Sequence, residues 1–540
     1  MHEETARPRQ GSIAGRSHNL APALWAPAIL GLIYVCFFSH LGVLGLTGPD
    51  EPRYASVARA MVESGDWVTP RLNGQPWFEK PVLYYWTAAI SFRLFGVNEF
   101  AARLPSALAA TLGTLALAWA GWRFYGSRAA WSVLLIFPTC IGTFAFARAA
   151  TTDMPFSAAL AAAMVAALAT VRSARMSIVA CAGFGVFLGA ATLAKGPAAL
   201  VLAGGSMGMW ALASRQWRAT LRLAHPVAIV FFCLTALPWY ALCAARNPDF
   251  LRTFLFRHNI ERYLMPMFHH EQPFWFFAPV LLLGLLPWTF LLGGVVRDAL
   301  RARQQARWAG STGLFLACWG LFPVLFFSFS KSKLPGYVLP AIAPLALLLA
   351  RSAARAIEER DSVSRALFGG VGITFVVLAA LSSHWLKRLP TASGLADPHR
   401  AVAWMLAGVA GGLTVALLAL LRRPAAALLV ATALMSAGIE AANRRVLPQL
   451  DGFLSPRAAA RAGEARFRPG EGVFVHRLHR AWLYGLNFYL HRELAQWSPQ
   501  SLSGWVYTNA AGLAEFENKN VRCTVVERGS PEAILVRVEP

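Results

Sequence analysis

Two short segments near the start of this 540-residue chain combine acidic, basic and aromatic side chains. Asp50 and Arg53 belong to the first segment, and Glu79, Lys80 and Tyr84 belong to the second. A carboxylate can hold a metal ion, act as a base or stabilise a cationic transition state, while Lys and Arg suit a phosphate. The structural alternative for the first segment is a solvated loop that ends in a helix cap, and for the second it is a simple surface ion pair between Glu79 and Lys80.

Two further segments carry charged groups that are candidates for a site. Arg148 lies five residues before Asp153, and the structural alternative is that these two side chains pair at a helix end. His258 and Arg262 are four residues apart, which places them on one face of a helix. Arg can grip a phosphate, whereas a lone His is more often structural and becomes a metal ligand only when an acid such as Glu79 reaches it.

A fifth group of candidates consists of Lys195 and of residues 331–337, which include Lys333 and Tyr337. Each Lys stands at the end of an apolar run, where it could bind an anion. The alternative is that its long side chain only reaches toward water. The sequence His269-His270-Glu271 is a weaker candidate for a metal site.

The elements that position these groups are predicted to be membrane helices. The chain is 56% hydrophobic and 14% charged, whereas soluble domains are about 25% charged. Apolar runs of about 20 residues predict a polytopic membrane protein and exclude a secreted disulfide scaffold, a disordered chain and a soluble nucleic-acid binder. Thirteen candidate spans lie at about 24–46, 102–122, 129–147, 154–171, 178–194, 197–213, 225–243, 275–294, 310–329, 337–350, 366–385, 401–421 and 425–442.

The distribution of Arg predicts how the chain crosses the membrane. With residues 1–23 as a cytoplasmic tail, six cytoplasmic loops carry seventeen Arg and four acids, in agreement with the positive-inside rule. This interpretation accounts for most of the net charge of +23. Residues 82–95 are then an interfacial helix, since counting them as a span would invert every later loop. All five candidate segments fall on the outer face, which suggests an active site there.

The composition changes after about residue 445. Residues 446–540 lack long apolar runs and contain short strand-like stretches, so we expect a small α/β domain outside the membrane. The predicted organisation is therefore a transmembrane domain at 24–445, with outer loops at 47–101 and 245–274, followed by this terminal domain.

The order of the motifs resembles a known family. The motifs are Asp50-Glu51-Pro52-Arg53-Tyr54, Trp77-Phe78-Glu79-Lys80-Pro81, Thr152-Asp153-Met154-Pro155, Ala194-Lys195-Gly196-Pro197 and Ser332-Lys333-Leu334-Pro335-Gly336-Tyr337. Over about residues 20–450 the chain resembles the GT-C glycosyltransferases of the protein-mannosyltransferase superfamily, most closely the ArnT-like lipid A 4-amino-4-deoxy-L-arabinose transferases. The resemblance implies an α-helical polytopic GT-C fold and agrees with the thirteen spans.

The resemblance also implies substrates and site residues. The donor would be undecaprenyl phosphate carrying aminoarabinose, and the acceptor a lipid A phosphate at the periplasmic face of a bacterial inner membrane, giving resistance to polymyxin and other cationic antimicrobial peptides. The resemblance implies a Zn²⁺ or similar ion at Glu79 and His258. It implies no nucleotide cofactor and no nucleic-acid partner. The implied catalytic residues are Asp50, Glu79 and Asp153, the donor-phosphate contacts Arg53, Lys80, Arg262 and Tyr337, and further substrate contacts Tyr84, Lys195 and Lys333.

Elementary chemistry agrees with these roles. Breaking the bond between the sugar C1 and a phosphate oxygen leaves charge on the departing lipid phosphate, which cationic and phenolic groups stabilise. The anomeric carbon becomes oxocarbenium-like, so a carboxylate beside it helps. Because a phosphate acceptor is already ionised, Asp50 need not act as a strong base and can orient the acceptor or stabilise positive charge. Asp153 can meet the donor's amine.

Three alternatives remain open from the sequence, and the third, a nucleic-acid or structural membrane protein, is supported only by the Arg on the cytoplasmic loops. The first keeps the fold but moves another polyprenyl-phosphate-linked sugar to protein, hopanoid or glycan, and only the pocket lining decides between these substrates. The second is a lipid flippase or transporter without chemistry. A transporter predicts charged groups near mid-membrane or paired broken helices, whereas the acids here gather at one face.

Overall fold

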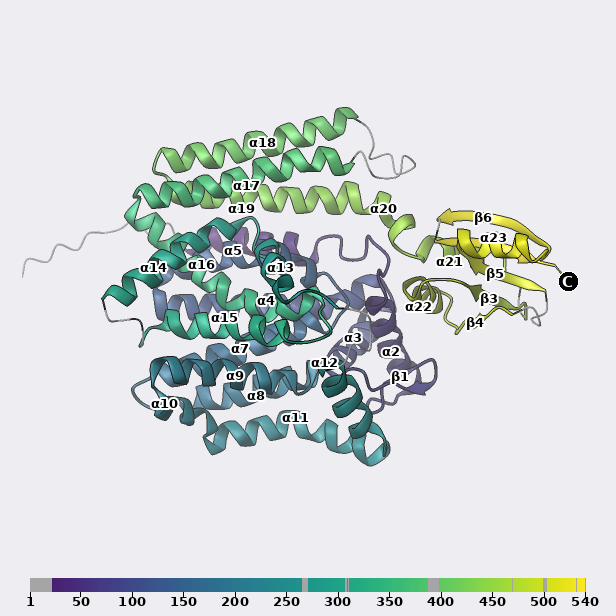
Figure 1. Ribbon diagram of the computed structural model, residues 1–540, viewed down its shortest axis with the longest axis horizontal. Coiled ribbons are helices and arrows are strands. Elements are labelled where there is room, and N and C mark those ends of the chain that lie inside the picture. The colour runs from purple at the N-terminus through teal and green to yellow at the C-terminus, as the bar shows by residue number, and fades with distance from the viewer. Residues whose placement is uncertain are drawn as a thin grey trace, which may run out of the picture.

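The computed structural model describes residues 22–264, 271–305, 308, 310–386, 398–468, 470–498, 503–530 and 532–539. Helices dominate the chain. They form a bundle whose long axes run side by side, and a small domain at one end of the bundle holds the C-terminal residues (Figure 1). This arrangement confirms the predicted α-helical polytopic fold with a terminal α/β region.

By length and composition, eight described helices are long and apolar enough to cross a membrane. They are α4 (Glu99–Tyr125), α7 (Asp153–Arg172), α8 (Ile178–Lys195), α11 (Pro226–Arg246), α16 (Leu339–Glu359), α17 (Ser362–Leu386), α18 (Pro398–Leu420) and α19 (Pro424–Ala441). Shorter apolar helices occupy Trp25–Phe38, which joins α1 (Pro22–Ile33) to η1 (Tyr34–Phe38), and also form α9 (Ala198–Ser214) and α15 (Thr312–Ser328).

Two further candidate spans are broken helices, which would bring the eight to ten. The first pairs α5 (Ser127–Thr139) with α6 (Ile141–Ala147) at an angle of 62°. The second joins α13 (Phe277–Gly284) to η5 (Trp288–Leu291) and α14 (Leu292–Gln304) across a bend of 104°. Every predicted span therefore has a helix or a broken helix at its position. The span predicted at 275–294 is present but sharply bent, and Pro287 at the bend lacks the N–H that would continue the helix.

Two short helices lie across the end of the bundle that faces the terminal domain (Figure 1). They are α2 (Asp50–Ser64) and α3 (Leu83–Phe95), and neither is long enough to cross a bilayer. Between them runs a hairpin of β1 (Arg71–Leu72) and β2 (Gln75–Pro76), which the sequence pattern did not predict. Its turn residues Asn73 and Gly74 both have positive φ, the geometry of a two-residue hairpin turn. The hairpin leads directly into the segment that carries Glu79 and Lys80.

The terminal domain contains a five-stranded sheet in the order β4-β3-β5-β7-β6. Its strands are β3 (Val473–His476), β4 (Ala495–Gln496), β5 (Gly504–Thr508), β6 (Cys523–Ser530) and β7 (Ala533–Val538). Strand β3 is parallel to β4 and β5, whereas β7 is antiparallel to both of its neighbours. Helices α21 (Arg457–Glu464), α22 (Arg480–Tyr489) and α23 (Ala510–Asn518) cover the sheet.

The terminal domain is tied to the outer loops by polar contacts. Arg457 donates to Glu99 (3.0 Å) and to Asp451 (2.7 Å), and it also donates to the backbone carbonyls of residues 42 and 43. The hydroxyl of Tyr489 accepts from the N–H of Leu46 (2.8 Å) and donates to Glu99 (2.9 Å). The terminal domain is therefore fixed against the loops that flank α2 and α3.

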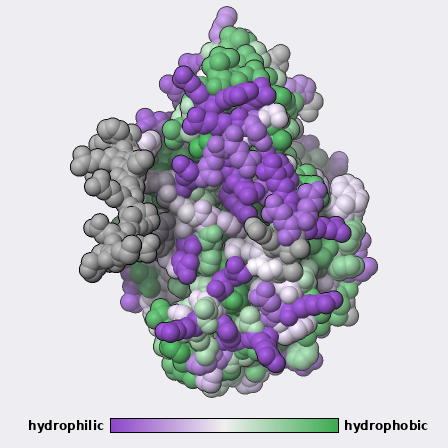
Figure 2. All heavy atoms as spheres, turned by 90° about the vertical axis from the view of Figure 1, so that its left-hand side faces the viewer, coloured by the Kyte–Doolittle hydropathy of each residue, from purple (hydrophilic) through white to green (hydrophobic). Residues whose placement is uncertain are grey.

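The opposite end of the bundle is strongly polar. Figure 2 views that end directly, and hydrophilic side chains gather there over the ends of the helices. Helices α10 (Trp217–Leu221) and α14 lie at this end (Figure 1). Arg297 pairs there with Asp361 (2.8 Å), and Arg355 pairs with Asp298. The predicted Arg-rich loops therefore share one end of the molecule, and the candidate site segments lie at the other.

Candidate active site

A cavity of about 380 Å³ opens at the end of the bundle where the predicted segments meet. Four elements supply its polar lining: the segment after the hairpin, the end of α8, the η3 helix (Arg252–Glu261) and the loop before α16. The lining includes seven residues of the predicted segments and motifs: Glu79, Lys80, Lys195, Pro197, His258, Ser332 and Tyr337. Segments more than 250 residues apart in the chain therefore share one cavity, as their common outer face predicts.

Arg53 links the first two predicted segments. Its guanidinium contacts Asp50 (2.6 Å) and Glu79 (3.0 Å), and Lys80 lies 3.7 Å from the other oxygen of Glu79. The Arg53 side chain is 10% exposed, while that of Asp50 is 43% exposed. Asp50 is thus the accessible carboxylate of the cluster, and Glu79 is the buried one. The cluster keeps one anionic group open to a substrate beside two cations.

The pKa of Arg53 reflects this setting. Burial alone would lower the pKa of the guanidinium, but Tyr54, Glu79 and Asp50 outweigh burial and hold it above its ordinary value. Aromatic rings pack around the same group, with Tyr54 at 5.1 Å, Trp77 at 5.5 Å and Tyr484 of the terminal domain at 5.8 Å. Arg53 therefore stays charged and is fixed in place between the two carboxylates.

A second pair of opposite charges joins Lys195 of α8, which lines the cavity, to Asp153 of α7, which lies behind it. Lys195 forms a salt bridge with Asp153, and its ammonium lies 5.2 Å from the ring centre of Tyr337. Gly196 follows Lys195 with φ of +72°, and a Cβ there would meet the ring of Phe254 at 2.5 Å. The chain therefore needs glycine to turn at the point where α8 presents Lys195. This pairing also shows that the alternative Arg148–Asp153 contact is wrong.

The proposed metal ligands Glu79 and His258 line the same cavity. Within the described ranges there is no group of three or more His, Cys, Asp or Glu side chains that could hold a metal ion. Arg53 and Lys80 already balance the charge of Glu79. A divalent ion would have two protein ligands here, fewer than the three or four that a resident zinc usually has. Substrate or water oxygens would have to complete its coordination.

Among the described side chains, five predicted site residues do not line the cavity. Arg53 contacts the lining residue Glu79, Asp50 contacts Arg53, and Asp153 pairs with the lining residue Lys195.

The other two of these residues are predicted substrate contacts whose polar atoms are bonded elsewhere. Tyr84 is fully buried and its hydroxyl donates to the carbonyl of Ala102 (2.8 Å), so it does not line the cavity. Lys333 is 7% exposed and donates to the carbonyls of Ser330 (2.7 Å) and Gln272 (3.0 Å). Burial, followed by the charge of Lys331, lowers the pKa of Lys333. Lys333 thus braces the loop that carries Tyr337.

Two other predictions lie wholly or partly outside the described residues. The backbone of Arg262 begins helix α12 (Arg262–Leu264), but its side chain is not described. Residues 269 and 270 of the His-His-Glu sequence also lie outside the described ranges.

Two residues beside the cluster are absent from the sequence predictions. Tyr85 is fully buried, and burial, then the charge of Glu79, raises its pKa. Tyr484 packs on Arg53 from the terminal domain. Tyr85 directly follows the predicted Tyr84, so the aromatic pair is a signal that points to it. Nothing local to Tyr484 connects it with a segment more than 400 residues earlier.

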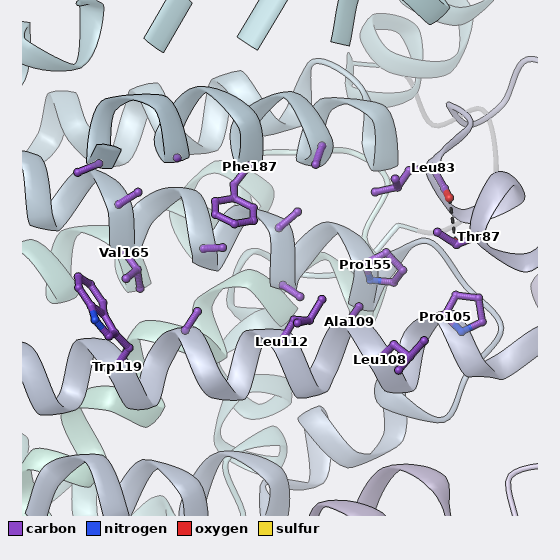
Figure 3. A pocket seen from close by; sticks show the side chains of 18 of the residues that line it. Leu83, Thr87, Pro105, Leu108, Ala109, Leu112, Trp119, Pro155, Val165 and Phe187 are labelled. Carbon is purple, nitrogen blue, oxygen red and sulfur yellow. Dashed lines mark hydrogen bonds between the residues drawn. The ribbon is translucent and has the colours of Figure 1, made fainter. Parts of the chain in front are cut away.

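A long apolar groove adjoins the site from the membrane side. Its volume is about 940 Å³, and α3, α4, α7 and α8 line it. Figure 3 shows Pro105, Leu108, Leu112 and Trp119 of α4 on one side, with Phe187 across from them. These α4 residues extend over about 21 Å at 1.5 Å per residue, more than half the hydrocarbon thickness of a bilayer.

Most of the groove lining is apolar, and its few polar side chains include Thr87, Ser91 and Arg123. The hydroxyl of Thr87, at one end of the groove, is bonded to the carbonyl of Leu83 at 2.9 Å (Figure 3). Leu83 lies three residues after Lys80, and Pro155 lies two residues after Asp153. The groove therefore begins where the polar site ends, and it suits a hydrocarbon chain.

Comparisons with known proteins agree with this geometry. Residues 24–254 match the family model "Dolichyl-phosphate-mannose-protein mannosyltransferase". The fold matches the crystal structure of ArnT from Cupriavidus metallidurans bound to undecaprenyl phosphate, with a TM-score of 0.79 and 24% identity over 96% of this chain and 98% of that one. This match confirms the GT-C fold.

Curated relatives are more similar in sequence. The undecaprenyl phosphate-alpha-4-amino-4-deoxy-L-arabinose arabinosyl transferase of Erwinia tasmaniensis is 34% identical over 66% of this chain and 64% of its own length. The chain thus spans just under two thirds of that relative. The protein of the same description from Photorhabdus laumondii is 32% identical over 70% of this chain and 68% of its own length. The chain therefore belongs to the family of undecaprenyl phosphate-alpha-4-amino-4-deoxy-L-arabinose arabinosyl transferases.

Proposed function

We propose that the protein transfers 4-amino-4-deoxy-L-arabinose from undecaprenyl phosphate to a phosphate of lipid A. One observation carries the proposal: members of two carboxylate–cation clusters from distant segments, Glu79 and Lys80 in one and Lys195 in the other, line a single cavity beside an apolar groove suited to lipid. Arg53 with Asp50 and Glu79 forms one cluster, and Asp153 with Lys195 forms the other. The proposal rests also on the names of the curated relatives.

The reaction that fits these groups is a displacement at the anomeric carbon. An oxygen of the acceptor phosphate attacks C1 of the sugar, the bond from C1 to the donor phosphate oxygen breaks, and undecaprenyl phosphate leaves with the bonding electrons. Lys80 and Tyr337 line the cavity and stabilise the departing phosphate. Asp50 stabilises positive charge at C1 or orients the acceptor. No proton needs to be removed from an ionised phosphate.

The remaining charged pair suits recognition of the sugar. Asp153 is held beside the cavity by Lys195. We assign Asp153 to the donor's amine, because a carboxylate gives a cationic amino group a charge-assisted hydrogen bond. Lys195 then stays near the phosphate, where its positive charge balances the negative charge of the substrate.

A divalent ion would be held by Glu79 and His258. Such an ion would act as a Lewis acid toward a phosphate oxygen. The described residues perform the other tasks: Arg53 fixes Glu79, Lys80 binds the phosphate and Asp50 faces the reacting sugar.

We place the site on the periplasmic face of a bacterial inner membrane. The Arg-rich loops at the opposite end of the bundle support this orientation through the positive-inside rule. The transmembrane domain then comprises residues 24–445, with outer loops at 47–101 and 245–274, and residues 446–540 form a periplasmic domain over the site. The apolar groove lies on the bilayer side of the site, where an acyl chain of the acceptor would enter.

The experiment that tests this function is mass spectrometry of lipid A from a strain that lacks endogenous transferase activity. With the chain expressed, we expect aminoarabinose on a lipid A phosphate and higher resistance to polymyxin. An Asp50→Ala variant at equal abundance should not add the sugar. Unmodified lipid A, together with sugar on protein, hopanoid or glycan, would favour the alternative acceptors instead.

A further inference from the structure

A second polar cavity, which we call the Arg148 cavity, lies behind the segment that carries Asp153. Its volume is about 260 Å³, and residues 40–47, the start of α2, α4 and the end of α6 line it. Arg148 and Ala149 belong to its lining, whereas Asp153 pairs with Lys195 at the active site. The chain from residue 148 to residue 153 therefore connects the two cavities.

Two charged residues of this lining neutralise each other. Arg103 donates to both carboxylate oxygens of Glu51 (2.8 and 2.7 Å), and its other N–H groups donate to the carbonyls of residues 41, 44 and 45. Glu51 also accepts from the N–H of Ala150 (2.8 Å) and of Thr47 (2.7 Å). Both side chains are buried and fully bonded, so they form the wall of the cavity and offer no charge to a ligand.

Arg148 is different, because its charge is not balanced. One terminal nitrogen donates to the carbonyl of His40 at 3.3 Å, and the guanidinium lies 5.6 Å from the ring centre of Phe144. The other terminal nitrogen is buried without a hydrogen-bond partner. Among the residues that the structure describes, Arg148 takes part in no ion pair. Buried donors are almost always bonded in proteins, so this nitrogen is a donor available to an acceptor from outside the chain.

The nearby carboxylate does not supply an acceptor. Glu440 is bonded to Ser39 and Arg444, and its oxygen lies 3.7 Å from the imidazole of His40. The cavity wall thus has an excess of positive charge. It stands at the end of the broken span α5–α6, and a charged group at the mouth of a membrane span is usually functional or paired.

We propose that the Arg148 cavity binds a phosphate group of a lipid head group. Arg offers two N–H groups in a fork that matches a phosphate. Two sources share this chemistry: a second phosphate on the acceptor lipid itself, or the phosphate of a surrounding anionic phospholipid. The five-residue separation between Arg148 and Asp153 limits the distance between their Cα atoms to about 18 Å. One acceptor with two phosphates can therefore reach both cavities. Only this first source rests on the proposed function.

Direct binding tests the site without reference to catalysis. Purified, delipidated full-length protein is titrated with phosphatidylglycerol, phosphatidylcholine or lipid A in detergent, and bound lipids are counted by native mass spectrometry. We expect Arg148→Gln to lose at least tenfold in affinity for anionic lipids while Arg148→Lys keeps most of it. Arg246→Gln is the matched control, since Arg246 is exposed at the same end of the molecule and lines neither cavity.

Kinetics then separate the two sources. If the acceptor supplies the phosphate, Arg148→Gln raises KM for a bisphosphorylated acceptor by about tenfold and leaves a monophosphorylated one unchanged. If the bilayer supplies it, the effect of the variant follows the phosphatidylglycerol content of the vesicles for both acceptors. Either pattern supports the site. Equal anionic-lipid binding by wild type, Arg148→Gln and Arg246→Gln would overturn it, whether or not the protein transfers aminoarabinose.

Discussion

Asp50 and Glu51 are adjacent in the chain, but their side chains differ in exposure. Asp50 is half exposed beside Arg53, whereas Glu51 is buried against Arg103. Replacing Asp50 by Asn keeps the shape but removes the charge, so we expect kcat to fall by about 100-fold or more, as for the loss of one transition-state contact. The measurement is transfer from a purified donor lipid. Glu63→Gln is the control, since Glu63 is an exposed acid on the same helix, and equal rates for wild type and Asp50→Asn would contradict the assigned role.

Tyr337 offers a test of the phosphate contacts. Its ring packs on Phe327 (4.9 Å) and near Lys195, so Tyr337→Phe keeps the packing and removes only the hydroxyl. We expect a loss of about 10-fold in kcat and an unchanged melting temperature, because a donor to the leaving phosphate is absent. Tyr263→Phe is the matched control on the same cavity lining. A fall in melting temperature without any kinetic change would instead give Tyr337 a packing role.

At the residue scale, the sequence indicates which side chains are candidates for a site, but it does not indicate which of them pair with one another. The types and spacing of Asp50, Glu79 and Asp153 are sufficient to indicate a site. Which adjacent acid faces outward depends on Arg103, fifty-two residues away from Glu51. Likewise the sequence favours Tyr84 as a substrate contact, whereas in the structure its hydroxyl donates a hydrogen bond to the carbonyl of Ala102. Such partners come from tertiary packing, which no local pattern encodes.

At the scale of elements, the loop after the first span depends on close contact with the terminal domain. A Cβ at Gly45 would come within 2.2 Å of the Ser455 hydroxyl and 3.0 Å of the Tyr489 hydroxyl. We therefore expect Gly45→Ala to destabilise the protein by about 1–3 kcal/mol, the usual cost of overpacking. Differential scanning fluorimetry in detergent measures this as a lower melting temperature. Gly438→Ala, where a Cβ meets nothing within 4 Å, should not lower it.

The helices themselves were predictable for a physical reason. A bilayer requires about 20 apolar residues per span, so hydropathy alone located the spans. The breaks were not predictable from hydropathy, because the 104° bend between α13 and α14 preserves the apolar composition. The short hairpin before Glu79 was equally unpredictable, because strands of two residues leave no periodic pattern.

At the scale of the whole molecule, the proposed function depends on the two ends of the bundle facing opposite compartments. We expect Glu63→Cys and Asn518→Cys, both at exposed positions near the site and in the terminal domain, to react with a membrane-impermeant maleimide in intact spheroplasts. Arg218→Cys, exposed at the Arg-rich end, should react only after permeabilisation. The seven native cysteines are mostly buried, and the unmodified chain sets the background. Labelling of Arg218→Cys in intact spheroplasts would place the active site in the cytoplasm and exclude a periplasmic acceptor.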